Sequence, residues 1–101
     1  MNRIDQRFQD LKAEGKTAFI PYITAGDPTL AQTEKIVYAL EEAGADIIEF
    51  GVPFSDPIGD GPVNQEAALR ALKHNITLKD VIGLIKSIRA KSQVAILIFT
   101  Y

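Results

Sequence analysis

Three acidic residues are the side chains of this sequence best suited to chemistry. Glu49 lies inside an apolar stretch (IIEFGV), and Asp56 and Asp60 follow in a segment rich in proline and glycine (PFSDPIGDGP). A carboxyl group that is largely removed from water has a raised pKa, and it can then donate and accept protons near neutral pH. Glu49 is therefore a candidate general acid and base, with the two aspartates as candidate partners.

Each of these acidic residues also has a purely structural alternative. A glutamate near the end of a strand can point to solvent or pair with a lysine of a neighbouring helix. Asp60 precedes Gly61 and Pro62, so either Asp60 or Gly61 can cap the next helix, while Asp56 before Pro57 is typical of a turn. Three oxygen ligands on one segment can also bind Mg²⁺. A magnesium-dependent, aldolase-like barrel is therefore one alternative function.

Three apolar runs predict the strands that position these residues. They span residues 17–23, 45–52 and 93–101, and Pro21 weakens the first because it cannot donate to a ladder. Strands that alternate with helices along the chain are parallel and joined by crossovers. Functional groups of such folds gather at the carboxyl ends of the strands, and Glu49 lies near that end of the second strand.

Apolar periodicity and end signals predict four helices between and before these strands. The first should end at Gly15, and the second should begin with Asp27 as N-cap and Pro28 at the first helical position. The third should follow Pro62, and Thr77 with Asp80 is spaced like a capping pair for the fourth. The helices are predicted from these apolar positions: Ile4, Phe8, Leu11, Ile36, Val37, Leu40, Ala43, Ala67, Ala68, Leu69, Leu72, Val81, Leu84, Ile85 and Ile88.

Composition excludes several classes of function. The net charge is −2, and the 11 lysines and arginines never occur three together, so the sequence carries no nucleic-acid footprint. The longest apolar run, residues 94–99, is far shorter than a membrane span, and the polar start lacks the apolar core of a signal peptide, so we expect a cytoplasmic protein. With no cysteine and the single His74, the sequence predicts neither a thiolate nor a multi-histidine metal site.

The length predicts part of a larger fold. The 101 residues suffice for one modest domain, yet they end directly after an apolar strand. A closed barrel of alternating strands and helices needs eight strands and about 250 residues. We therefore expect residues 1–101 to form the amino-terminal part of a single α/β barrel domain, with about three parallel strands.

Two stretches resemble the alpha subunit of tryptophan synthase. They are FIPYITAGDP (19–28) and IEFGVPFSDPIGDGP (48–62), and the likeness runs from the first helix to the end of the chain, including NQ at 64–65. Phe50 and Asn64 depart from the family's usual residue types. The resemblance implies a (β/α)₈ barrel, of the TIM-barrel type, that cleaves indole-3-glycerol phosphate to indole and glyceraldehyde 3-phosphate without a cofactor of its own.

The resemblance also implies roles for individual residues. Glu49 would be the acid and base that protonates the indole carbon, and Asp60 would accept a hydrogen bond from the indole N–H. Tyr22 would pack against the indole ring. Thr100 and Tyr101 would line the indole pocket.

The segment after the second strand would contact the partner of this subunit. By resemblance, that partner is the pyridoxal-phosphate-dependent beta subunit in an alpha₂beta₂ heterotetramer, and the contact residues would be Pro53, Phe54, Asp56 and Pro57. The phosphate-binding loops of such barrels follow the seventh and eighth strands. We therefore expect little activity from these 101 residues alone. The remaining alternative is a noncatalytic half-barrel that self-associates or docks to a partner through its open strands.

Overall fold

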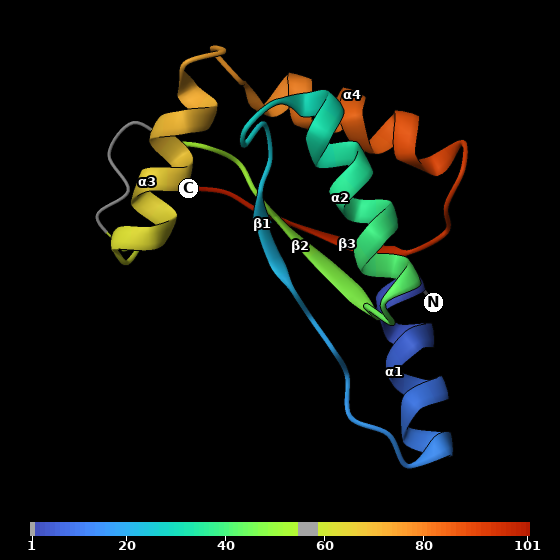
Figure 1. Ribbon diagram of the computed structural model, residues 1–101. Helices are drawn as coiled ribbons and strands as arrows, with labels where there is room; N and C mark the ends of the chain where they lie inside the picture. Colours follow the sequence, from blue (N-terminus) through green and yellow to red (C-terminus); the bar gives the residue numbers. More distant parts are fainter. Residues whose placement is uncertain (1, 55–58) are drawn as a thin grey trace.

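The computed structural model describes residues 2–54 and 59–101, and its described elements alternate as the sequence predicts. Figure 1 shows a small parallel sheet with helices packed on one face and at both ends of its strands. The elements in chain order are α1 (Arg3–Glu14), β1 (Tyr22–Thr24), α2 (Leu30–Glu42), β2 (Ile47–Gly51), α3 (Pro62–Leu72), α4 (Leu78–Arg89) and β3 (Ala95–Phe99).

The sheet has the order β1-β2-β3, and both strand pairs are parallel. This confirms the predicted topology. β1 is shorter than predicted and begins at Tyr22 rather than at residue 17. The reason is Pro21, which has no N–H for the ladder, although its carbonyl still accepts a hydrogen bond from the Glu49 N–H (2.9 Å). The chain before β1 therefore follows β2 only irregularly.

Helix α2 begins at a different residue from the predicted one. Thr29, not Asp27, is the N-cap, and its hydroxyl accepts a hydrogen bond from the Gln32 N–H (3.1 Å). The Asp27 carboxylate is engaged elsewhere, because Arg70 of α3 donates two hydrogen bonds to it (2.8 and 3.0 Å). The end signals of the other helices are confirmed: Gly15 in a left-handed conformation ends α1, Pro62 opens α3, and Thr77 with Asp80 forms a capping box on α4.

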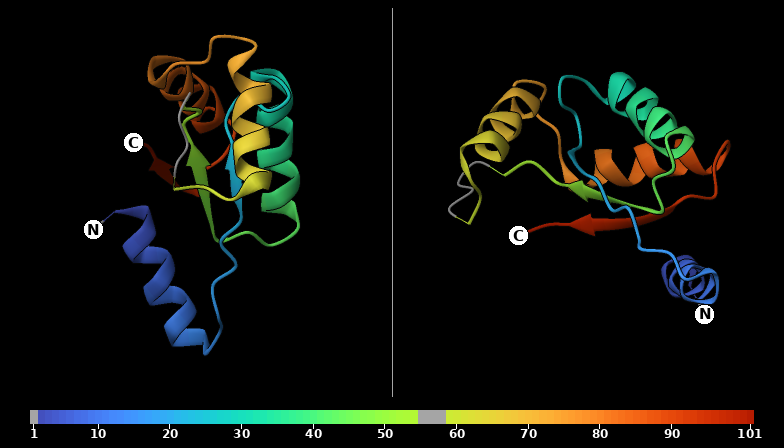
Figure 2. Two further views of the ribbon diagram at one scale, coloured as in Figure 1. Left: turned by 90° about the vertical axis from the view of Figure 1, so that its left-hand side faces the viewer. Right: turned by 60° about the horizontal axis from the view of Figure 1, so that its bottom comes forward.

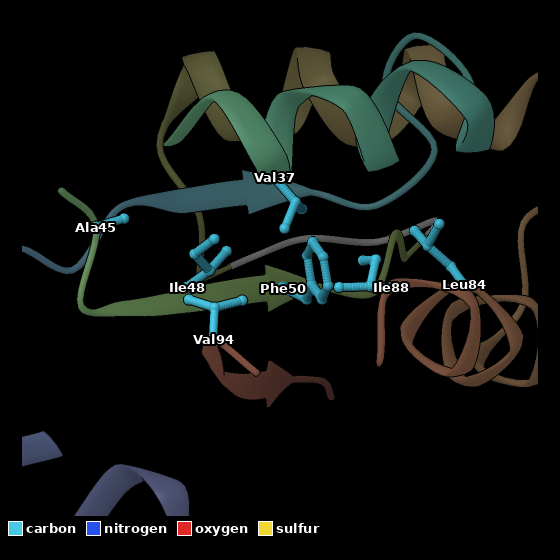
Figure 3. Packing of buried hydrophobic residues seen from close by; sticks show 7 residues of the cluster. All are labelled: Val37, Ala45, Ile48, Phe50, Leu84, Ile88 and Val94. Carbon is cyan, nitrogen blue, oxygen red and sulfur yellow. The ribbon is translucent and has the colours of Figure 1, made fainter. Parts of the chain in front are cut away.

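The main core lies between one face of the sheet and helices α2 and α4. Ile48 and Phe50 of β2 are fully buried there, against Val37 of α2 and Ile88 of α4 (Figure 3). The two further views agree that α2 and α4 lie on the same face of the sheet (Figure 2). Of the positions predicted for the buried face of α2, Ile36 is instead partly exposed and Ala43 lies just beyond the helix.

The opposite face of the sheet carries the alternate residues of the strands. Because successive side chains of a strand point to opposite faces, residues in register with Glu49 share its face. We call this the open face; it is formed by Tyr22, Glu49, Gly51, Leu97 and Phe99. In the described part of the chain, Leu97 and Phe99 on the open face are 43% and 51% exposed, and Ile98 on the opposite face is 36% exposed, so helices close neither face at the end of β3.

Asp46 joins α1 to the start of β2. Its carboxylate accepts hydrogen bonds from the Phe19 N–H (2.7 Å) and from Arg7 Nε of α1 (2.8 Å), and its side chain is almost fully buried. The Phe19 hydrogen bond is the main cause that lowers the pKa of Asp46, and the Arg7 guanidinium lowers it further against the opposing effect of burial. Nothing in the sequence pattern pointed to this anchor.

Replacing Asp46 with asparagine should destabilise the fold in a pH-dependent way. Because the pKa of Asp46 is lower in the folded than in the unfolded chain, its contribution is present above about pH 4 and is lost as the pH falls through the folded pKa. Urea unfolding should give a loss of about 1–3 kcal/mol near neutral pH that shrinks on acidification. The exposed Asp10→Asn is the control, and a difference that stays constant with pH would contradict the assignment.

Helix α3 lies at the end of the sheet where the strands finish, and α1 lies at the end where they start (Figure 1). Ala67 and Ala71 bury the inner side of α3. Asp60, which precedes the N-cap of α3, therefore lies near the carboxyl end of the strands. Among the described residues, no helix is both long enough and apolar enough to cross a bilayer.

Candidate functional site

Glu49 is the third of the five residues of β2 and lies on the open face. It is half-buried and is in register with Tyr22 on one side and Leu97 on the other. In the described part of the chain, no hydrogen bond or ion pair engages its carboxylate, so the structural alternative of a lysine partner does not apply there. The carboxylate is therefore available to a molecule that binds over the open face.

Tyr22 lies across Gly51 on the same face. The hydroxyl end of its ring occupies the position that a Cβ atom at residue 51 would take. The ring also meets Phe99 edge to face, with ring centroids 6.3 Å apart and planes at 86°. Gly51 is thus needed for the close approach of Tyr22, and Phe99 fixes the ring from the neighbouring strand. These contacts place an aromatic surface beside Glu49.

Replacing Gly51 with alanine should displace the Tyr22 ring. Forcing an extra carbon into a packed position costs about 1–3 kcal/mol, which urea unfolding should show as a loss of stability. Gly83→Ala is the matched control, because nothing lies within 4 Å of its Cβ position in α4 and alanine favours helix. A Gly51→Ala, Tyr22→Val double variant should recover most of the loss. Equal stability of the two single alanine variants would rule out this packing.

Asp60 lies two residues before the start of α3 at Pro62. The N-cap of α3 is Gly61, and no side chain caps the helix, so the Asp60 carboxylate does not serve as a cap. Instead, it interacts with the Tyr101 hydroxyl. Desolvation is the main cause that raises the pKa of Tyr101, and the interaction with Asp60 raises it further. The chain after β3 and the start of α3 therefore meet at Asp60.

Tyr101 also contacts the chain that follows β2. Its ring stacks on Phe54, with centroids 4.8 Å apart and planes at 25°. An electrostatic interaction with Tyr22 is a smaller cause that raises the pKa of Tyr101. Pro53 is buried. Tyr22 is in register with Glu49, and Tyr101 interacts with Asp60. The aromatic cluster of Tyr22, Gly51, Phe99, Phe54 and Tyr101 thus lies beside both predicted catalytic carboxylates.

Three further residues were predicted for the site or the partner contact. Asp56 and Pro57 lie outside the described residues. Thr100 follows β3, and its hydroxyl donates only to the carbonyl of Tyr101 (3.4 Å). Its place in a pocket wall stays a prediction.

Sequence reasoning missed two residues of the cluster. A glycine in the interior of a strand signals close approach of another group, which could have identified Gly51. Alternation along β3 places Phe99, rather than Thr100, on the face of Glu49.

Among the residues that the structure describes, no three acidic or histidine side chains come together in an arrangement that could hold a metal ion. The magnesium alternative invoked Asp56 together with Glu49 and Asp60. Asp56 lies outside the described residues.

Comparison with known sequences identifies close relatives. The family model described as "Tryptophan synthase alpha chain" matches residues 8–101. The tryptophan synthase alpha chain of Caldanaerobacter subterraneus subsp. tengcongensis is 56% identical over all 101 residues, and that of Thioalkalivibrio sulfidiphilus is 55% identical over 88% of this chain. The chain spans only 38% and 34% of their lengths.

Solved structures of similar proteins share the fold. The crystal structure of tryptophan synthase subunit alpha from Legionella pneumophila str. Paris is 42% identical, and it matches with a TM-score of 0.97 over all of this chain and 39% of that one. A tryptophan synthase complex from Pyrococcus furiosus is 44% identical, with a TM-score of 0.78 over 83% of this chain and 35% of that one. These matches confirm the predicted fold class, an amino-terminal part of a (β/α)₈ barrel. The chain belongs to the tryptophan synthase alpha chain family.

Proposed function

We propose that residues 1–101 supply the acid-base half of an active site that cleaves indole-3-glycerol phosphate to indole and glyceraldehyde 3-phosphate. One observation carries the proposal beyond family membership. The Glu49 carboxylate makes no hydrogen bond or ion pair in the described chain, Asp60 interacts with the Tyr101 hydroxyl, and the aromatic cluster that includes Tyr22 and Tyr101 lies beside both acidic residues. We also propose that these residues are part of one barrel domain in a longer protein of the relatives' length.

The two carboxylates would divide the chemistry between them. Glu49 would protonate the substituted carbon of the indole ring and take the proton of the glycerol hydroxyl, so that the bond between ring and side chain breaks and an aldehyde forms. Ring protonation places positive charge on the indole nitrogen. A carboxylate at Asp60 that accepts the N–H would stabilise this charge more in the transition state than in the ground state.

The aromatic cluster would hold the indole ring between these groups. Tyr22 and Phe99 form an edge-to-face pair on the open face, and Tyr101, which follows β3, is stacked on Phe54. Flat aromatic surfaces favour a flat aromatic ligand through stacked and edge-to-face contacts. Thr100 would complete the wall. The phosphate of the substrate would bind to loops of later strands, which these 101 residues do not include.

The proposal includes a partner subunit. One solved structure of a similar protein is named as a tryptophan synthase complex from Pyrococcus furiosus, and another as tryptophan synthase from M. tuberculosis in an aminoacrylate-bound form. By family resemblance, the partner is a beta subunit that carries pyridoxal phosphate in an alpha₂beta₂ assembly. Phe54 is 42% exposed and would meet it together with Pro53, Asp56 and Pro57.

A chimera tests the proposed function directly. Residues 1–101 replace the matching 38% of the Caldanaerobacter relative, so that the later strands come from that protein. We expect the purified chimera to release indole from indole-3-glycerol phosphate, whereas the 101-residue chain alone should show little or no turnover because phosphate positioning is absent. A folded chimera without indole release, beside an active parent relative, would refute the proposal.

One observation favours the second candidate, a noncatalytic piece that associates through its open strands. Leu97, Ile98 and Phe99 of β3 are all partly exposed, and the outer edge of β3 has no neighbour in the described chain. Sedimentation of the 101-residue chain separates the two. A cooperative fold that remains strictly monomeric at all concentrations would count against self-association.

A further inference from the structure

The peptide group of Asp60 is fixed from the first turn of helix α3. The side-chain amide of Gln65 donates a hydrogen bond to the Asp60 carbonyl oxygen, with Nε2 and the oxygen 2.7 Å apart. The Gln65 N–H donates to the Gly61 carbonyl (3.0 Å), so the main chain of the glutamine is itself held in the helix. This short bond links a half-buried helical residue to the residue that carries the proposed catalytic carboxylate.

The helix that carries Gln65 is anchored independently of the segment before it. Three alanines of α3 are buried, namely Ala67, Ala68 and Ala71. Arg70 of the same helix donates two hydrogen bonds to Asp27 in the turn after β1. Gln65 therefore connects residue 60 to a fixed part of the molecule. The N-cap Gly61 supplies no side-chain cap that could do so.

The hydrogen bond from Gln65 to the Asp60 carbonyl is not part of a capping box. In a capping box, a side chain of the first turn accepts a hydrogen bond from the N–H of the N-cap residue, as Asp80 does for Thr77 in α4 (2.9 Å). Gln65 instead donates, and it donates to the carbonyl of the residue before the N-cap. The contact thus determines where the peptide of Asp60 lies rather than closing the helix.

We propose that Gln65 is a positioning residue that keeps the Asp60 carboxylate at the indole nitrogen. The inference rests on the proposed function and deepens it, because it assigns to an amide of α3 the placement of the charge that stabilises the transition state. Displacement of a catalytic group by about 1 Å can cost up to about a hundredfold in rate.

Kinetics of the chimera test the inference. Gln65→Met keeps length, volume and helix preference but removes the donor, and we expect kcat to fall about tenfold while KM changes less than about threefold. The exposed Gln9→Met in α1 is the matched control and should leave both constants unchanged. In an Asp60→Asn background, Gln65→Met should cost less than about twofold more, because both changes remove the same interaction.

A second readout does not depend on turnover. Asp60 helps to raise the pKa of Tyr101, so release of Asp60 in Gln65→Met should move the titration of that hydroxyl downward, as seen by NMR of labelled tyrosine rings assigned with Tyr101→Phe. A chimera without activity refutes the proposed function, and the titration then still decides whether Gln65 positions Asp60. An active chimera in which Gln65→Met matches Gln9→Met, or an unmoved Tyr101 titration, overturns the inference alone.

Discussion

The Glu49→Gln variant of the chimera is expected to lose about 10²–10⁴-fold in kcat, with KM changed by less than about threefold. Glutamine has the size of glutamate but can neither donate an acidic proton nor accept one. Because the Glu49 carboxylate makes no hydrogen bond or ion pair in the described part of the chain, its replacement by an amide removes no such interaction from the fold. Steady-state indole release measures both constants, and urea unfolding should show stability unchanged within about 0.5 kcal/mol.

Glu42→Gln is the matched control for this variant, since Glu42 is exposed at the end of α2. It should retain full activity. Addition of Mg²⁺ separates the metal alternative from acid-base chemistry. If turnover of the unmodified chimera required the metal, or if Glu49→Gln kept near-normal kcat, the assigned role of Glu49 would be wrong.

The Asp60→Asn variant should lose about 10²–10³-fold in kcat, the usual cost of removing one group that stabilises developing charge. Asparagine can still accept a hydrogen bond from the indole N–H, but it carries no negative charge to balance the protonated ring. The loss should therefore appear in kcat rather than in KM. Asp10→Asn, exposed on α1, is the control.

Asp60 also offers a spectroscopic check that is independent of turnover. Loss of its charge should move the Tyr101 titration downward, because the carboxylate is one of the causes that raise the pKa of that hydroxyl. An Asp60→Asn chimera with unchanged kcat would show that Asp60 has only a structural role at the start of α3.

Local sequence signals predicted the elements that rest on neighbouring residues. The end of α1 at Gly15 and the capping box of Thr77 and Asp80 need only a few adjacent positions, and both are confirmed. The N-cap of α2 was predicted wrongly at Asp27. That carboxylate pairs with Arg70, 43 positions away, and no local pattern reveals such a partner. Thr29 then takes the cap.

The site could be predicted by residue type but not by contact. An acidic residue within an apolar strand pointed to Glu49, and its register with Tyr22 follows from the parallel order of the strands. The close approach of Tyr22 to Gly51 and the hydrogen bond from Gln65 to the Asp60 carbonyl depend on the conformations of individual side chains. The periodicity of apolar residues carries no information on these conformations.

A crystal structure of the Glu49→Gln chimera with indole-3-glycerol phosphate bound would test the central claim most directly. The account predicts the indole ring against Tyr22, with an Asp60 carboxylate oxygen about 2.6–3.2 Å from the ring nitrogen and the residue 49 side chain within similar reach of the substituted ring carbon or the glycerol hydroxyl. An indole ring bound away from the open face, or with its nitrogen directed away from Asp60, would contradict it.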